Sequence, residues 1–380
     1  MQLPTQTIDA YYQLQQFVSL GWLSTQIVLI AGLLFMGLTT TGRSVLLSIS
    51  KKVRPWPLAA ALFYFSIAVV LKLVQLTITY LLIVKKSQLD ATEAPSLLGF
   101  LGSQAPGILA SALLLSVLGL ILVFILRKAT TLTWLWLAIA ITIIASVALT
   151  ARPHFRDTIP LGNSPAEQKI VQLLQRAGIP SGRIALEDCS GQAACPPGQV
   201  IGLGPTKLIL FDSRLTSRTP EDQLLQVAAH EAKHFLIDND LKPIIAIFLI
   251  CCFIFFVTQI SIRLLQRNEC DRIALIQLVP TAYAFGLVAF LLAQPIITTW
   301  HRNLELEADR FGLEFNRNNQ ALIDIMWNDV KQNPMAYRHT PITKFLRATH
   351  PQIKDRIKLA ESYRPWIDGD PLKYDAYFPD

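Results

Sequence analysis

VAAHEAKHFL, at residues 227–236, contains the pattern H-E-x-x-H inside a run that predicts a helix. Residues four apart lie on one helical face, so His230 and His234 can present their imidazoles to one cation. Zinc accepts two histidines in this geometry. Glu231 follows the first histidine and can reach a water molecule beside the metal, which suits a general base. The pattern favours metal-assisted hydrolysis, with an amide bond as the leading target.

The start of this helix is signalled just upstream. Thr219 is a predicted N-cap, and Pro220 fits the first helical position. Glu221 and Asp222 then place negative charge at the positive end of the helix. The alternative is that two histidines and a glutamate fall in this order by chance on a buried or interface helix. Two later stretches weigh against that alternative.

The composition indicates a membrane protein. The chain has 380 residues, is 52% hydrophobic and 16% charged, and has a mean hydropathy of +0.40, which is too apolar for an ordinary soluble protein. Six runs of about 20 residues or more are long enough to span a hydrocarbon core. They cover residues 17–38, 57–84, 106–126, 131–150, 243–262 and 273–297. The first is interpreted as a retained helix, because it is too long for a signal peptide and lacks a preceding basic stretch.

The distribution of charge predicts the orientation. The net charge of +7 needs no nucleic-acid partner, because basic residues flank the membrane segments. With six spans, the segment 151–242 and the C-terminal tail share one side, whose short segments hold only Lys85 and Lys86. The opposite side holds Arg43, Lys51, Lys52, Arg54, Arg127, Lys128, Arg263, Arg267 and Arg272. The bias predicts a multi-pass protein of a bacterial inner membrane with its catalytic side in the periplasm.

The positions of the five cysteines agree with this orientation. Cys251, Cys252 and Cys270 lie in or beside membrane helices, whereas Cys189 and Cys195 flank a short loop. In an oxidising compartment the latter pair would form a small disulfide, and two free thiols are the alternative. A zinc ribbon is excluded because no second cysteine pair is present.

Lys72 and Gln75 interrupt the second apolar run. A charge at that depth faces a protein interior or a water-filled cavity, which hints at a polar chamber. Alternatively, Lys72 snorkels or pairs within a helical bundle. The following loop, residues 85–105, contains Gly, Ser and Pro and is predicted to be irregular.

Residues 151–229 are predicted to form a compact aqueous domain. Ser164-Pro165-Ala166-Glu167 is a capping box that starts a helix, which ends near Gly178. Short β-rich runs follow at residues 183–186, 199–202 and 207–211. These runs predict a small sheet beside the metal-binding helix.

An edge strand of that sheet is a candidate site for the substrate. Val200, Ile201 and Gly202 are the residues proposed to bind an extended peptide by adding it to the sheet. An ordinary structural hairpin is the alternative.

A third ligand is predicted directly after the last membrane span. A zinc site with two histidines needs another protein ligand and an open position for water. Glu305 can supply that ligand, and Asp309, one turn further along, can orient a ligating histidine. Glu307 points elsewhere on a helix, and His301 is the rival ligand. A solvated acidic helix is the alternative.

The C-terminal tail adds His350 and Arg356, with Pro351 as a predicted helix start. These two side chains could stabilise the oxyanion that forms when water attacks a carbonyl. From the residues alone, a capped surface helix with a solvated arginine is the preferred interpretation.

The combined motifs resemble the membrane zinc metallopeptidases that include the type I CAAX prenyl protease and the HtpX-like proteases. The resemblance rests on residues 202–212 (GLGPTKLILFD), on HEAKH at 230–234, on E-x-x-A-D at 305–309, and on Thr349-His350-Pro351 with Arg356. It covers about residues 200–357; the first 150 residues are similar only in being membrane helices.

The resemblance implies a set of roles. These are zinc ligands at His230, His234 and Glu305, a water-activating Glu231, a supporting carboxylate at Asp309, and transition-state or substrate contacts at His350 and Arg356. The sequence departs from the family at Lys233, at His301 and at Gln199-Val200. The named relatives work on the cytoplasmic side, whereas the charge bias here points outward.

The sequence thus predicts a predominantly α polytopic membrane protein with a small α/β catalytic domain. The expected regions are 1–150 (four membrane helices), 151–242 (catalytic domain), 243–297 (transmembrane hairpin) and 298–380 (third ligand and the rest of the catalytic domain). The expected activity is endopeptidase cleavage of membrane-associated or unfolded proteins with one zinc ion per chain. A non-catalytic zinc-binding scaffold or transporter-like protein, and a zinc hydrolase acting on a non-peptide lipid or amide, are the alternatives.

Overall fold

A computed structural model describes residues 5–89, 92–128, 130–162, 164–189, 195–238, 241–265 and 272–378. Within these ranges, six helices are long and apolar enough to cross a bilayer, which confirms the predicted polytopic, mainly α fold. They are α1 (Thr5–Leu38), α3 (Trp56–Leu89), α4 (Leu97–Arg127), α5 (Thr133–Ala151), α9 (Leu241–Leu265) and α10 (Arg272–Asn316). Several of these helices extend past the predicted apolar runs. A continuing helix keeps its backbone hydrogen bonds satisfied.

The prediction of an irregular loop at residues 85–105 is wrong over most of that range. Helix α3 continues to Leu89 and α4 already begins at Leu97. The chain before the first apolar run, which was predicted to begin at residue 17, is likewise helical from Thr5 onward. In both places polar residues continue a helix instead of ending it.

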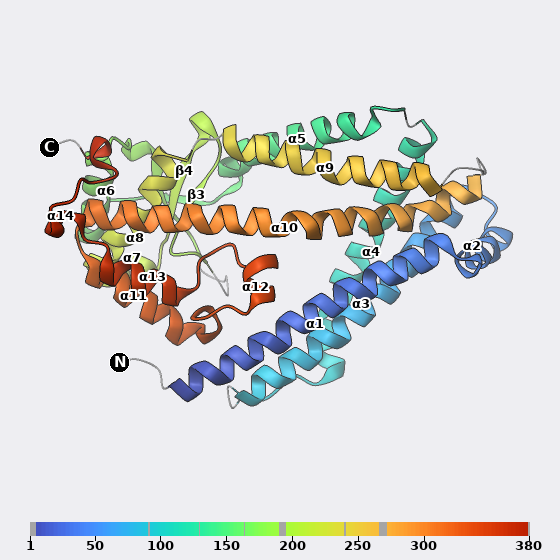
Figure 1. Cartoon of the computed structure of the whole chain (residues 1–380), viewed down its shortest axis with the longest axis horizontal. Helices are drawn as coiled ribbons and strands as arrows, with labels where there is room; N and C mark the ends of the chain where they lie inside the picture. The colour runs from blue at the N-terminus through green and yellow to red at the C-terminus, as the bar shows by residue number, and fades with distance from the viewer. Residues whose placement is uncertain are drawn as a thin grey trace.

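Helix α10 joins the membrane region to the predicted catalytic domain (Figure 1). Its 45 residues reach about 68 Å at about 1.5 Å per residue. A hydrocarbon core is only about 30 Å thick, so the C-terminal half of α10 extends beyond it. Glu305 and Asp309 lie on that extension.

The predicted catalytic domain contains a four-stranded sheet with the order β1-β2-β4-β3. Its strands are β1 (Thr158–Pro160), β2 (Ile184–Glu187), β3 (Gly198–Ile201) and β4 (Leu208–Asp212). Strands β2 and β4 are parallel, and β1 and β3 pair antiparallel at the two edges. The three predicted strands are thus present, and the exposed three-residue β1 was not predicted.

Helices α6 (Pro165–Arg176) and α8 (Glu221–Leu236) pack with the sheet and α10 around one apolar core. Ile170, Phe211, Leu224 and Phe311 contribute to it from these elements. The Ser164 hydroxyl accepts a hydrogen bond from the Glu167 backbone, which confirms the predicted helix start. Helix α8 begins one residue later than predicted, because Pro220, not Thr219, occupies the N-cap.

The remaining helices complete the two ends of the molecule. They are α2 (Thr40–Lys52), α7 (Leu215–Arg218), α11 (Asn319–Gln332), α12 (Pro341–Leu346), α13 (Ile353–Ser362) and α14 (Pro365–Asp368). Short 3-10 turns lie at Arg152–Phe155, Ser181–Arg183, Gly204–Thr206, Pro334–Ala336 and Asp375–Tyr377. Helix α13 starts at Ile353 with Gln352 as its N-cap, so Pro351 lies just outside the helix it was predicted to start.

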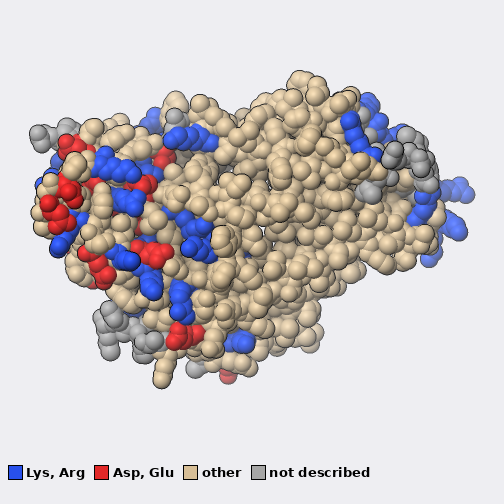
Figure 2. All heavy atoms as spheres, viewed as in Figure 1, with Lys and Arg blue, Asp and Glu red and all other residues tan. Residues whose placement is uncertain are grey.

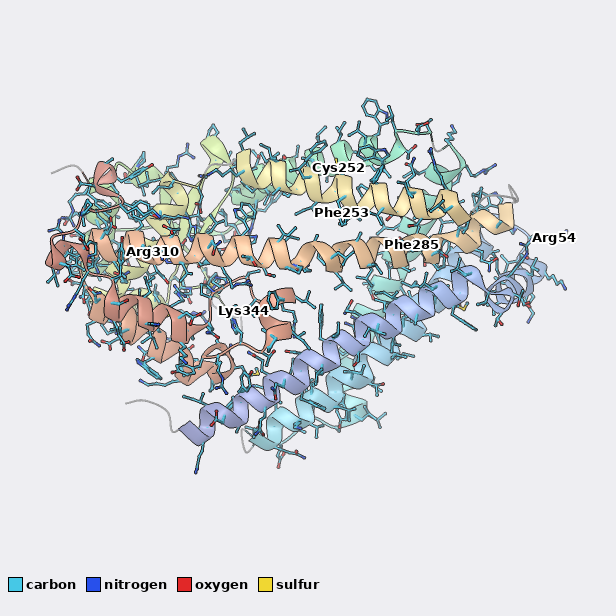
Figure 3. The ribbon with its side chains drawn as sticks, in the orientation of Figure 1. Arg54, Cys252, Phe253, Phe285, Arg310 and Lys344 are labelled. Atoms are coloured by element: carbon cyan, nitrogen blue, oxygen red, sulfur yellow. A yellow bond between two sulfur atoms is a disulfide. The ribbon has the colours of Figure 1, made fainter. Side chains whose placement is uncertain are left out.

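Charged side chains gather at the two ends of the molecule and leave a band without charged side chains between them (Figure 2). One end carries basic residues with no acidic ones in view, and Arg54 lies there; the other end is mixed and holds Arg310 (Figures 2 and 3). Cys252, Phe253 and Phe285 lie between (Figure 3). Arg267 and Cys270, named in the sequence analysis, fall outside the described residues.

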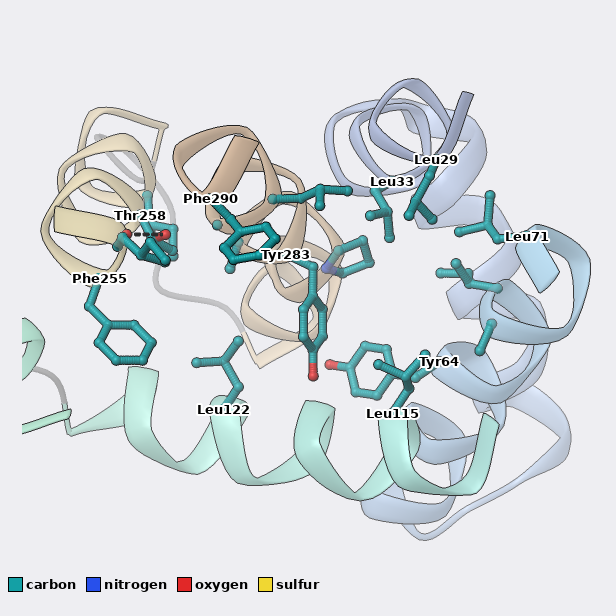
Figure 4. A pocket seen from close by; sticks show the side chains of 18 of the residues that line it. Leu29, Leu33, Tyr64, Leu71, Leu115, Leu122, Phe255, Thr258, Tyr283 and Phe290 are labelled. Atoms are coloured by element: carbon teal, nitrogen blue, oxygen red, sulfur yellow. Dashed lines mark hydrogen bonds between the residues drawn. The ribbon is translucent and has the colours of Figure 1, made fainter. Parts of the chain in front are cut away.

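A cavity of about 800 Å³ lies among the membrane helices (Figure 4). Its walls are mostly apolar, and Tyr64 and Tyr283 point toward each other there. Lys72 lines this cavity, and its Nζ donates to Gln75 Oε1 at 3.2 Å. Lys72 thus lines the cavity and also pairs with a neighbour on its own helix, which combines features of the two sequence alternatives.

Candidate metal centre

Three donor groups from two helices converge on one point. His230 Nε2 and His234 Nε2 are 3.3 Å apart, because the two residues are one turn apart on α8. Glu305 on α10 places its carboxylate oxygens 3.4 Å from His230 Nε2 and 3.6 Å from His234 Nε2. Tetrahedral zinc with bonds of about 2.0–2.2 Å sets neighbouring donors about 3.3–3.6 Å apart. The three groups therefore fit a zinc ion.

The ring of His230 is oriented by a carboxylate on the side away from the other donors. Asp309 Oδ1 lies 3.0 Å from His230 Nδ1, and the Asp309 side chain is fully buried. A carboxylate at Nδ1 accepts that ring proton and leaves Nε2 as the acceptor for a metal. Arg356 on α13 donates from Nε and Nη2 to the same carboxylate at 2.7 and 2.6 Å. The described hydrogen bonds of Arg356 thus go to Asp309.

Glu231 lies beside the donor groups and faces the first residue of β3. Its carboxyl is buried, and burial raises its pKa above the ordinary value. A Cβ atom at position 198 would come within 2.8 Å of Glu231 Cγ, so only glycine fits there. Gly198 therefore lets the edge strand approach the predicted general base.

His350 lies at the open side of the site. Its Nε2 is 3.5 Å from Glu305 Oε2, and 64% of its side chain is exposed. Arg302 on α10 holds the loop before it by donating to the Ala348 carbonyl at 2.9 Å. His301, the predicted rival ligand, is exposed and contacts the Trp300 ring, and it is not one of the three converging donors.

Glu307 points away from the donors. It accepts hydrogen bonds from Tyr374 and from Lys373 and pairs with Arg310, so it fastens the C-terminal segment to α10. The helical spacing predicted this separation of Glu307 from Glu305.

The model of peptidase family M48 matches residues 170–364, more than half of the 380-residue chain. The chain belongs to peptidase family M48. It is 24% identical over 222 residues to an uncharacterized metalloprotease of Bacillus subtilis (strain 168), YhfN; the match covers 55% of this chain and 50% of that protein. This chain therefore spans half the length of that relative.

Its fold is also similar to the crystal structure of S. mikatae Ste24p, with a TM-score of 0.52 and 17% identity. That likeness covers 94% of this chain and 99% of the other. Membership of M48 and the fold together confirm the family resemblance that the four motifs indicated. The chain is therefore an M48 member with six described helices that are long and apolar enough to cross a membrane, and the family implies a metal at its centre.

Among the described residues of this M48 chain, the predicted substrate strand lies at one edge of the sheet. Val200 and Ile201 belong to β3, whose partner β4 lies on one side only. Gly202 lies past the end of the strand with a φ of +87°, and a Cβ there would come 2.4 Å from the Thr206 carbonyl oxygen. Gly202 therefore belongs to the turn after the strand, and Gly198 takes its place beside the site.

Two further residues of this M48 chain were not assigned roles from the sequence, and one of them, Asp238, contacts a ligand residue. Asp238 Oδ2 lies 2.7 Å from His234 Nδ1, and Lys233 Nζ lies 2.6 Å from Asp238 Oδ1. Burial opposes ionisation of Asp238, yet hydrogen bonds from His234 and Lys233 lower its pKa. The spacing of four residues between His234 and Asp238 was the available signal.

Proposed function

We propose that this M48 protein is a zinc-dependent endopeptidase that cleaves membrane-associated or unfolded protein substrates. The observation that carries the proposal is the convergence of His230, His234 and Glu305 at 3.3–3.6 Å, the spacing of tetrahedral zinc ligands. These three residues would hold one zinc ion per chain. When bound, the metal supplies polarisation of the scissile carbonyl and of the attacking water.

Proton transfer, oxyanion stabilisation and positioning are then assigned to the chain's own residues. Glu231 takes a proton from the attacking water on its carboxylate and passes it to the leaving amine, so one C–O bond forms as the C–N bond breaks. His350 donates to the carbonyl oxygen as negative charge develops there. Arg356 acts through Asp309, because the described hydrogen bonds of its guanidinium are with that carboxylate.

The substrate is proposed to bind as an extended peptide along β3. The free edge of this strand offers backbone donors and acceptors, and Gly198 brings that edge against Glu231. Backbone pairing selects for extended chains over folded ones, which suits unfolded segments near a bilayer. No nucleic-acid partner is proposed, since the basic residues flank the membrane helices.

Removal of the metal tests this function directly. Treatment of the detergent-solubilised protein with a chelator is expected to abolish casein cleavage, and one equivalent of zinc per chain is expected to restore it. Metal content would be measured alongside the rate of peptide release. Zinc binding without any cleavage would instead support the scaffold alternative, and cleavage that survives complete metal removal would contradict the proposal.

The catalytic side is proposed to face away from the cytoplasm. Basic residues gather at the end of the molecule opposite the catalytic domain (Figure 2), which is the side that remains cytoplasmic. Cys189 and Cys195 are joined by a disulfide, a bond typical of oxidising compartments. Both observations favour a periplasmic site in a bacterial inner membrane.

Labelling of intact cells checks this orientation. After mild external reduction, a membrane-impermeant thiol reagent is expected to label Cys195 in intact cells, because the reagent reaches only the outer side. The Cys189→Ser/Cys195→Ser variant is the control for labelling of Cys251 and Cys252. Labelling that requires lysed cells would place the catalytic domain in the cytoplasm.

A further inference from the structure

Lys233 is a lysine in the middle of the H-E-x-x-H motif, and it is almost fully buried, with 2% of its surface exposed. Burying an ammonium group is costly unless it is paired and hydrogen-bonded. Its Nζ donates to Asp238 Oδ1 at 2.6 Å and to the Leu304 carbonyl at 3.2 Å. The ammonium group of Lys233 thus makes two hydrogen bonds close to two of the predicted metal ligands, His234 and Glu305.

Asp238 connects this lysine to the second histidine. Its other oxygen, Oδ2, accepts the proton on His234 Nδ1 at 2.7 Å. That hydrogen bond fixes the tautomer of the ring and leaves Nε2 as the acceptor that faces His230 and Glu305. Asp238 lies just past the end of α8 at Leu236, so it closes back on the helix that carries His234.

The two histidines are therefore supported in parallel ways. His230 is backed by Asp309, which Arg356 neutralises. His234 is backed by Asp238, which Lys233 neutralises. Each support consists of a ring N–H, a carboxylate and a buried cation.

We propose that Lys233 and Asp238 form a second positioning pair for the metal centre, dedicated to His234. This inference rests on the proposed zinc site. Lys233 also ties α8 to α10 at Leu304, the residue directly before Glu305, so the pair fixes the separation of the two ligand-bearing helices. A loss of either residue loosens the donor geometry without removing a donor.

Charge supports the same assignment. The site gathers four carboxylates, from Glu231, Glu305, Asp309 and Asp238, and two buried cations, from Arg356 and Lys233. Without Lys233, the Asp238 carboxylate would lie beside His234 without its paired ammonium group.

Zinc affinity of the full-length protein in detergent tests this pair. Asp238→Asn, which is nearly isosteric, and Lys233→Met, which keeps the apolar stem, are each expected to weaken zinc binding about 10–100-fold in competition with a chromophoric chelator. Lys233→Arg is expected to recover part of that loss. Lys169→Met removes a surface lysine paired with Glu221 and is the matched control with wild-type affinity. The melting temperature of the metal-free protein is measured in parallel.

Unchanged zinc affinity in both variants, with normal binding by the wild type, would overturn the positioning role and leave the proposed function intact. A fall in the metal-free melting temperature that accounts for the whole effect would overturn it in favour of a packing role. If Lys233→Met does not fold, Asp238→Asn decides alone. A wild-type protein that binds no zinc would refute the proposed function and this inference together.

Discussion

Glu231→Gln is expected to lower kcat for peptide cleavage by about 10²–10⁴-fold, the contribution of a positioned general base. Glutamine keeps the shape of the side chain and cannot take a proton from water. The carboxyl of Glu231 is not among the three converging donors, so zinc is expected to stay bound at one ion per chain. Metal analysis and the rate of peptide release, measured on the same preparation, check both halves of this expectation.

Glu221→Gln provides the matched control for Glu231→Gln. Glu221 lies on the same helix, at its exposed first turn, where it pairs with Lys169. Its loss is expected to leave cleavage near the wild-type rate, because a surface ion pair contributes at most about 1 kcal/mol to stability. Equal cleavage by the Glu231→Gln protein and the wild type would remove the proposed role of Glu231.

The parts of the site that could be predicted from sequence are those set by local geometry. His230 and His234 share a helical face at any i, i+4 spacing, so their convergence follows from α8 alone. His230 and Asp309 are 79 positions apart. No local pattern joins them, and their placement in one site was inferred from the need of a zinc site for a third ligand and from the resemblance to a known family. The membrane spans were likewise predictable, since length and hydropathy decide them.

The remaining features depend on packing that leaves no local pattern. The family resemblance implied a transition-state or substrate contact for Arg356, and the residues alone favoured a solvated arginine, whereas the packing of α13 directs its donors to Asp309. Lys233 attracted notice only as a departure from the family motif, because its partner Asp238 lies beyond the end of the helix. The role of Gly198 follows from the close approach of β3 to Glu231, which no sequence pattern indicates. The contacts of Arg356 and of Gly198 join elements whose relative placement the sequence does not specify.

Helix α10 explains how one chain unites the membrane with the site. A helix that stopped at the bilayer surface would leave Glu305 in a connecting loop, where its distance to α8 would vary. Because α10 continues unbroken to Asn316, the ligand is fixed by the same rigid element that crosses the membrane. Arg302 extends this order to the His350 loop by donating to the Ala348 carbonyl.

His350→Phe is expected to lower kcat by about 10²–10³-fold, the usual cost of losing one donor to a developing oxyanion. The side chain is 64% exposed on the open side of the site, with Nε2 3.5 Å from Glu305 Oε2. It is therefore placed to meet a substrate carbonyl, and it is not one of the three converging donors. Zinc affinity and KM are expected to change little, which separates this loss from the loss of a ligand.

His301→Phe serves as the control for His350→Phe, because His301 is also an exposed histidine and contacts Trp300 instead of the donors. Its cleavage rate is expected to match the wild type. If both histidine variants cleave at the wild-type rate, His350 is a surface residue of a capped helix and the oxyanion must be stabilised by other groups. If His350→Phe instead loses zinc, its contact with Glu305 matters for the metal. A loss of kcat at unchanged zinc affinity therefore assigns His350 to oxyanion stabilisation, and a loss of zinc affinity assigns it to support of the metal ligands.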